Sequence, residues 1–255
     1  MSNIPVGVQL YSIREDCARD LPGTLEAVAQ IGYTGVEFAG YHNYTAAQLR
    51  KMLADNGLQC CGAHIGLDQL LGESLPGTLE FHLELGNRFL IVPGLAEERR
   101  NSRAAWQSTA RLFDEIADQL QPHGLRTGYH NHHVEFILMD GEAGFDTFFG
   151  CTRSEVIMQL DTGNALHGGA DPLACLRRYP GWAITLHLKE FSASNPLALI
   201  GEGNLPWKAI FELCEAGGTE WYIVEQESYP VSPLESVARC REALQRMGLG
   251  GHYDE

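Results

Sequence analysis

The chain has 255 residues, 44% of them hydrophobic and 20% charged, which is the composition of a globular protein with a large buried core. Its 18 lysines and arginines against 33 aspartates and glutamates give a net charge of −15, which argues against a protein that binds the nucleic-acid backbone. We find no apolar run long enough to span a membrane, no signal peptide and no CxxC pair among the seven cysteines, so we expect a cytoplasmic protein with reduced thiols.

Taken in chain order, short apolar segments alternate with amphipathic ones eight times. The apolar segments predict strands at Val6–Tyr11, Gly35–Ala39, Gln59–Ile65, Arg88–Val92, Arg126–His130, Glu155–Asp161, Ala183–Lys189 and Trp221–Glu225. Successive strands start 24 to 38 residues apart, which is too far for hairpins and suits parallel strands joined by helices.

The segments between the strands carry helix signals. Thr45 and Gln48 have the spacing of a capping box, and Asp171 and Ser232 each precede a proline that is suited to the first turn of a helix. Apolar residues from 109 to 120 form one helical face. The weakest helix is the short aromatic segment 143–150.

Eight strand–helix units in this length leave about 32 residues for each unit, which is typical of a (β/α)8 barrel. No linker or change of composition divides residues 1–255, so we expect one domain. An open doubly wound sheet is less well supported, because neither GxGxxG nor GxxxxGK[ST] follows the first strand.

Polar residues stand at the ends of nearly all the predicted strands, where the active site of such a barrel lies. Imidazole and carboxylate donors together suit Zn²⁺, Mn²⁺, Co²⁺ or Fe²⁺ better than Mg²⁺. Any one of these residues is more often a satisfied core or rim residue, but donors at one depth on four successive strands favour a metal site. The residues in question are Gln9, Glu37, His64, His130 with His132, Asp161, His187 with Lys189, and Glu225 with Glu227.

The remaining histidines lie in predicted helices, loops or the C-terminal tail. We expect them at the surface, where most histidines outside a site are found. They are His42, His82, His123, His167 and His252.

Seven segments in this order and spacing resemble the sugar phosphate isomerase/epimerase family of the xylose isomerase-like TIM-barrel superfamily, over nearly the whole chain. They are VGVQLYSIR, GVEFAG, YHNHHVEF, LDTGN, HLKE, GEGNLPW and YIVEQE. The YHNH segment resembles more closely the branch of the inosose (keto-inositol) dehydratases.

The resemblance implies a divalent metal held by a Glu-Asp-His-Glu set from strands five to eight. Asp161, His187 and Glu225 match the second, third and fourth ligands. The first position falls on His130 instead of glutamate, and His132 and Glu135 lie close to it in the sequence.

The resemblance also implies an isomerase or epimerase that removes a proton next to the carbonyl of a sugar, sugar phosphate or keto-sugar. A keto-inositol or keto-sugar dehydratase using the same site is the alternative, and a non-catalytic carbohydrate-binding barrel is a third hypothesis. Glu225 or Glu135 would act as the general base, and Lys189 or His64 would donate or relay the proton.

Four further residues are candidates for substrate binding. Gln9 and Glu37 would contact substrate hydroxyls or brace the barrel floor, His132 would contact the substrate, and Arg14 would hold an anionic group or form a surface ion pair. We expect a small carbohydrate as substrate and neither nucleic acid nor membrane as partner, and the resemblance allows a homo-oligomer. The related endonuclease IV-like nucleases carry ligands that are missing at Val92-Pro93, at Asn164 and in the segment 201–203.

Overall fold

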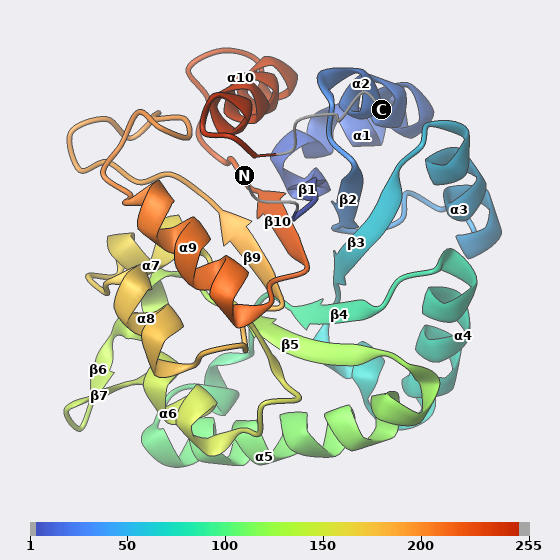
Figure 1. The fold of residues 1–255 in the computed structure, drawn as a ribbon. Helices are drawn as coiled ribbons and strands as arrows, with labels where there is room; N and C mark the ends of the chain where they lie inside the picture. The colour runs from blue at the N-terminus through green and yellow to red at the C-terminus, as the bar shows by residue number, and fades with distance from the viewer. Residues whose placement is uncertain (1–3, 250–255) are drawn as a thin grey trace.

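Eight parallel strands form one sheet in the computed structural model, which describes residues 4–249 (Figure 1). Hydrogen-bonded neighbours follow the order β8-β5-β4-β3-β2-β1-β10-β9. A parallel bridge between Asp161 and His187 joins the two outer strands, so the sheet closes into the expected (β/α)8 barrel. The strands are β1 (Val6–Gln9), β2 (Gly35–Phe38), β3 (Gln59–His64), β4 (Phe89–Val92), β5 (Arg126–His130), β8 (Ile157–Gln159), β9 (Thr185–Leu188) and β10 (Trp221–Val224).

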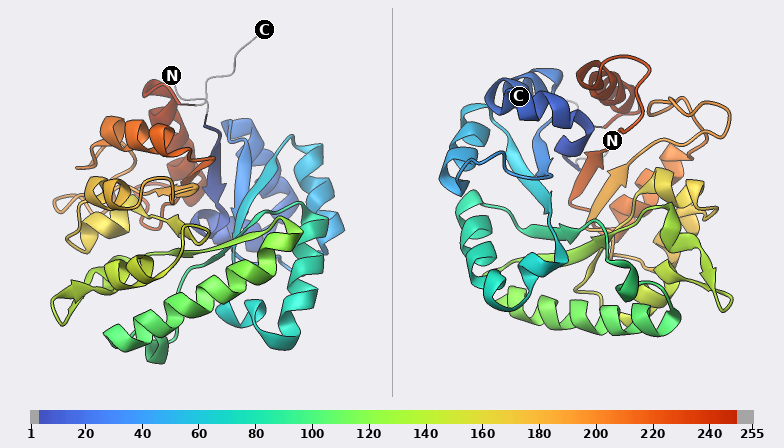
Figure 2. Two further views of the ribbon diagram at one scale, coloured as in Figure 1. Left: turned by 60° about the horizontal axis from the view of Figure 1, so that its bottom comes forward. Right: turned by 180° about the vertical axis from the view of Figure 1, so that it is seen from behind.

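Helices surround the barrel and cover the outer face of its strands (Figures 1 and 2). The capping box of Thr45 and Gln48 is formed, and the side chain of Ser232 caps the last helix. No helix within residues 4–249 has the length and apolar character needed to cross a bilayer. The α-helices are α1 (Arg14–Arg19), α2 (Leu21–Ile31), α3 (Ala46–Asp55), α4 (Leu75–Leu85), α5 (Arg103–Leu120), α6 (Gly144–Cys151), α7 (Thr162–His167), α8 (Pro172–Arg178), α9 (Trp207–Gly217) and α10 (Pro233–Arg246).

Several strands end earlier than the apolar pattern predicts, because polar side chains at their ends cap the next turn. The Gln9 side chain accepts a hydrogen bond from the Tyr11 amide at 3.0 Å, and the chain continues as the 3₁₀ helix Leu10–Ile13. Asp161 in the same way accepts from the Asn164 amide at 2.6 Å and starts α7. The sixth unit has a second short helix, α8, after α7.

An antiparallel hairpin of β6 (Leu138–Met139) and β7 (Glu142–Ala143) interrupts the connection between β5 and α6. Its turn consists of Asp140 and Gly141, both with positive φ, which is the geometry that an Asp-Gly pair favours in tight hairpins. This hairpin is not among the elements predicted from the sequence, although its Asp-Gly pair is a recognisable turn signal.

An apolar cluster fills the interior of the barrel below the strand ends. Glycines make room for its large members: a Cβ atom at Gly35 would lie 2.8 Å from the Trp221 ring. Polar side chains at the strand ends therefore rest on a dry, closely packed floor, which limits their movement. The cluster contains Cys61, Phe89, Ile91, Ile157, Trp221 and Ile223.

The expectation that the remaining histidines lie at the surface is wrong for His82, whose side chain is 1% exposed. Its ring nitrogens contact the Tyr41 hydroxyl at 3.2 Å and the Asn87 amide at 2.9 Å, and burial lowers its pKa to about 4. These partners satisfy a neutral imidazole inside the helix layer. His123 and His167 are exposed, and His252 lies outside the described residues.

Candidate metal centre

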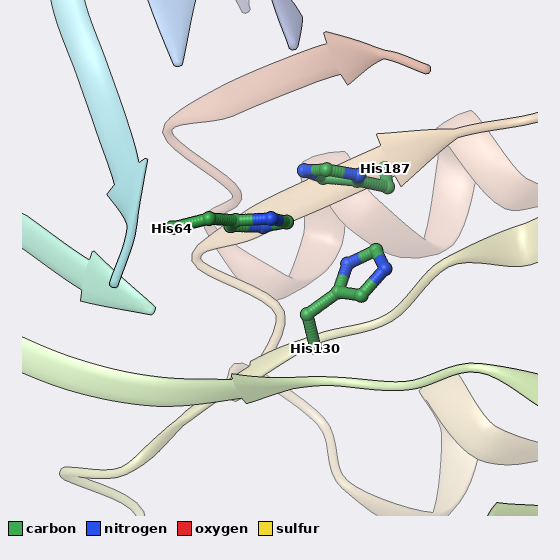
Figure 3. A group of neighbouring side chains, drawn as sticks. All are labelled: His64, His130 and His187. Carbon is green, nitrogen blue, oxygen red and sulfur yellow. The ribbon is translucent and has the colours of Figure 1, made fainter. Parts of the chain in front are cut away.

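Four buried side chains converge at the C-terminal mouth of the barrel. They come from β5, from the residue that precedes α7, from β9 and from the end of β10, and each places one donor atom within 4.8 Å of the other three. His64 adds a third imidazole at the end of β3, and Figure 3 shows it beside His130 and His187. The four side chains are those of His130, Asp161, His187 and Glu225.

The two nitrogens of His187 have different partners. Nδ1 lies 2.7 Å from Oε2 of Glu225, and Nε2 lies 2.6 Å from Oε2 of Glu37. Neighbouring donors on one zinc ion are about 3 Å apart, so Nδ1 and Glu225 have the spacing of two ligands. A histidine that binds a metal through one ring nitrogen usually donates the other N–H to a carboxylate, and Glu37 occupies that position at Nε2 of His187.

Two donor atoms of the cluster, Nδ1 of His130 and Oδ2 of Asp161, are buried and have no hydrogen-bond partner within residues 4–249. Such atoms are rare in folded proteins unless a water or an ion satisfies them. Two imidazoles and two carboxylates form the mixed nitrogen and oxygen set that Zn²⁺, Mn²⁺, Co²⁺ and Fe²⁺ favour. The residues present therefore fit a divalent cation.

The protonation of the cluster reflects its burial and its charges. Burial raises the pKa of Asp161 to about 7, although the nearby Lys189 opposes this shift. Burial alone would lower the pKa of His187, but Glu37 and Glu225 raise it to about 10. Burial also lowers the pKa of His130 well below its usual range. A metal binds these groups only after His187 and Asp161 lose their protons, so metal affinity falls at low pH.

Glu37 lies beneath the cluster and is fully buried. Its carboxylate accepts hydrogen bonds from Gln9 at 2.7 Å and from Gln159 at 2.8 Å, in addition to its contact with His187. Burial opposes the charge of Glu37, but His64, His187 and these hydrogen bonds outweigh it and lower the pKa. In this arrangement Glu37, held by Gln9, braces His187 from below.

Gln159 belongs to this site but is not among the candidates predicted from the sequence. Its amide nitrogen donates to Glu37 and to Thr185, and its oxygen lies 2.7 Å from Nε2 of His64. The segment Met158–Asp161 could have indicated this role, since residues two apart in a strand point to the same face, which places Gln159 beside Asp161.

Lys189 links the cluster to the solvent-facing side of the barrel mouth. Its Nζ lies 3.1 Å from Oε1 of Glu225 and also pairs with Glu227. Burial opposes its charge, but the surrounding carboxylates outweigh that effect and raise its pKa. Lys189 is therefore a cation whose charge is matched by two glutamates.

A pocket of about 600 Å³ opens beside Lys189, within the size range of small-molecule sites. The segments that follow β5, β9 and β10, together with α7 after β8, form it. One rim consists of neighbouring rings, with His167 stacked on Phe191 at 5.2 Å and tilted against His133 at 4.6 Å. Its other lining residues include His132, Asn164, Gln226 and Glu227.

Glu135 and Arg14 belong neither to the cluster nor to the lining of this pocket. Glu135 is buried, and its carboxylate accepts from the Tyr129 hydroxyl at 2.8 Å and from the His132 amide at 2.7 Å. Tyr129 points to the opposite face of β5 from His130 and packs in the helix layer. Arg14 donates to the Tyr11 carbonyl and to the Tyr229 hydroxyl.

The family model of the xylose isomerase-like TIM barrel matches residues 25–247. The chain belongs to this family. An inosose dehydratase from Serratia proteamaculans is 23% identical, over 85% of this chain and 86% of the relative. The fold matches a sugar phosphate isomerase/epimerase from Parabacteroides distasonis with a TM-score of 0.82, at 23% identity over 96% of this chain and 94% of the other.

A further structural neighbour is the IOLI protein, whose structure contains a zinc atom. It has a TM-score of 0.73 and is 13% identical over 95% of this chain and 97% of the other. These comparisons confirm the fold and the family that the sequence segments indicated. The relatives from Serratia proteamaculans and Parabacteroides distasonis carry the names of enzymes, a dehydratase and an isomerase/epimerase.

Proposed function

We propose that this protein is a divalent-metal-dependent isomerase or epimerase that removes the proton next to the carbonyl of a keto-sugar or related polyol ketone. The observation that carries the proposal is the buried donor set of His130, Asp161, His187 and Glu225 beside a pocket of about 600 Å³. The names of the relatives support the same class of chemistry.

His130, Asp161, His187 and Glu225 would hold the metal, which supplies Lewis-acid polarisation of a carbonyl when it is bound. Glu37 keeps Nε2 of His187 engaged, so that Nδ1 stays directed at Glu225. Asn131 fixes the backbone of Asp161 on both sides, since it accepts from the Asp161 amide at 2.9 Å and donates to the Asp161 carbonyl at 3.3 Å. The ligands are therefore held in position before substrate arrives.

The proton transfer falls to Glu225 and Lys189 in this proposal. Lys189 and His187 keep the pKa of Glu225 well below its usual value against the effect of burial, so its carboxylate is ionised, and we assign it the role of base with Oε1 facing Lys189. Lys189 carries the proton that can be returned to a substrate oxygen. His64 is the second candidate for the relay, since Gln159 holds its Nε2 at the edge of the cluster.

Glu135 and His132 receive supporting roles. Because Tyr129 and the His132 amide occupy the carboxylate of Glu135, we assign it to holding His132 at the pocket edge. His132 lines the pocket and lies 5.2 Å from the His130 ring, which suits a contact with a substrate hydroxyl.

A dehydratase is the second candidate, favoured by the names of the curated relatives. It would begin with the same proton removal and then expel a hydroxyl group as water from the neighbouring carbon. Glu225 and Lys189 would serve this reaction without rearrangement, since Lys189 can protonate the departing hydroxyl.

We infer that the substrate carries no phosphate. Lys189 is the only lysine or arginine that lines the pocket within the described residues, and Glu225 and Glu227 match its charge. Glu190 adds a further carboxylate to the lining. A phosphate would find no uncompensated cation here, and the repulsion of like charges would weaken its binding.

Incubation of the protein in D₂O with matched ketones tests the reaction and the charge of the substrate. We expect deuterium to enter the carbon next to the carbonyl of free ketoses or keto-inositols at least about tenfold faster than that of their phosphate esters. Exchange without loss of water identifies an isomerase or epimerase, and loss of water identifies the dehydratase. Faster exchange of the phosphate esters would contradict the neutral substrate.

Metal analysis of the purified protein tests the metal site directly. We expect about one divalent ion per chain, and removal of the ion with a chelator should lower Tm, because a ligand that binds only the folded state stabilises it. A metal content near zero together with a Tm that is insensitive to both chelator and added Zn²⁺ would overturn the metal model.

A further inference from the structure

Glu190 has an unusual role in the structure: its buried carboxylate accepts four hydrogen bonds. Oε1 accepts from the amides of Phe191 at 3.0 Å and Leu205 at 3.3 Å. Oε2 accepts from the Gly201 amide and from the Trp207 indole nitrogen, both at 2.9 Å. Every partner is an N–H donor, so only a group with two accepting oxygens satisfies all four.

Three of these donors, Phe191, Gly201 and Leu205, lie in the connection between β9 and α9, residues 189–206, which we call the β9–α9 loop, and Trp207 is the first residue of α9. The β9–α9 loop contains no α-helix or strand and is long for a connection in a compact domain, a property typical of functional loops. The loop supplies half of the residues that line the 600 Å³ pocket, among them Phe191, Ser192 and Asn195.

Gly203 allows the loop to approach the carboxylate closely. A Cβ atom at this position would overlap both Oε1 of Glu190 and the Phe191 carbonyl oxygen. The second glycine of the Gly-Glu-Gly segment is thus required by the packing around Glu190. Asn204 adds a backbone hydrogen bond to the Phe191 carbonyl at 3.0 Å, so the end of the loop is tied to its start.

We propose that Glu190 is a positioning residue whose carboxylate holds the β9–α9 loop as one wall of the substrate pocket. Through this wall Glu190 sets the affinity for substrate. This part of the proposal rests on the function proposed above. The loop in turn places Phe191 against His167, which follows the metal ligand Asp161 in the neighbouring unit. Loss of the carboxylate releases Gly201 and Leu205, and the wall loses its shape without a change in the metal ligands.

The variant Glu190→Gln tests this proposal, because its amide keeps one accepting oxygen and turns an N–H₂ group toward two donors. We expect hydrogen exchange at the Gly201 and Leu205 amides to become at least about tenfold faster. We expect KM for the ketone to rise about 10- to 100-fold while kcat stays within about threefold and the metal content is unchanged. Glu190→Asp, which keeps both oxygens, should restore part of the protection and of the affinity.

Glu202→Gln is the matched control, since Glu202 lies in the same loop but is exposed and accepts one amide bond, from Leu199 at 3.0 Å. It should leave KM and the exchange at Gly201 and Leu205 within about twofold of the wild type. Unchanged exchange in Glu190→Gln, or a loss of kcat at constant KM, overturns the positioning role. If Glu190→Gln does not fold, Glu190→Asp provides the test. Its side chain is one methylene shorter and reaches the four donors less well, so amide exchange at Gly201 and Leu205 and KM should both exceed the wild-type values. Exchange and KM equal to the wild type in Glu190→Asp would also overturn the positioning role. If the wild type turns over no ketone, the proposed function fails while the exchange result still reports on the loop.

Discussion

Replacing Glu225 with glutamine should reduce turnover by at least about 10³-fold, the largest effect that we expect from any single substitution. Glu225 is both a proposed metal ligand and the proposed base, and its two oxygens contact His187 at 2.7 Å and Lys189 at 3.1 Å. The neutral amide cannot accept the substrate proton and binds a cation weakly. Deuterium exchange with the ketone panel and metal analysis of the same preparation measure both losses.

Glu227→Gln is the control for this substitution. Glu227 pairs with the same lysine but is not one of the four clustered donors, so turnover should fall by about tenfold or less and the metal content should not change. Turnover in Glu225→Gln that equals the wild type would remove Glu225 from the reaction and favour the non-catalytic carbohydrate-binding barrel.

Replacing Glu37 with glutamine should lower the free energy of unfolding by about 3–5 kcal/mol, the range typical of breaking a buried ion pair from one side. The fully buried carboxylate accepts from His187, Gln9 and Gln159. A glutamine amide would turn donors toward donors and leave His187 without its outer partner. Urea unfolding at neutral pH measures the change in stability.

Metal affinity provides a second readout for Glu37→Gln. Loss of the partner that orients a ligating histidine typically weakens metal binding about 10- to 100-fold. The exposed pair of Arg88 and Glu220, 3.0 Å apart, gives the control: Glu220→Gln should change the unfolding free energy by about 1 kcal/mol or less and leave metal affinity unchanged. Equal effects of both substitutions would contradict the bracing role of Glu37.

The fold was largely predictable because its signals are local. Alternating apolar and amphipathic segments located all eight barrel strands, and capping residues such as Thr45 and Ser232 marked helix starts correctly. The ends of the strands were less predictable, since Gln9 and Asp161 cap the following turn instead of extending the ladder. The side chains of Gln9 and Asp161 compete with the strand for backbone hydrogen bonds, and a hydrophobic pattern carries no information about this competition.

The gathering of the proposed ligands followed from the sequence through one general rule. The C-terminal ends of parallel barrel strands meet at one mouth, so His130, Asp161, His187 and Glu225 had to lie near one another once the fold was correct. Strand alternation also placed His187 and Lys189 on the same side.

Only the tertiary structure decided which partner each donor has. Glu37 and His187 are 150 residues apart in the sequence, and they meet because the closed barrel brings β2 within reach of β9 across its interior. The same applies to the burial of His82 beneath Tyr41, to Glu135 facing Tyr129 on the outer side of β5, and to the four donors that surround Glu190. The sequence by itself determined the strand–helix alternation and the residue types at the strand ends, because both depend on residues that are close together in the sequence. The pairing of those groups depends on distances across the barrel, which no local pattern encodes.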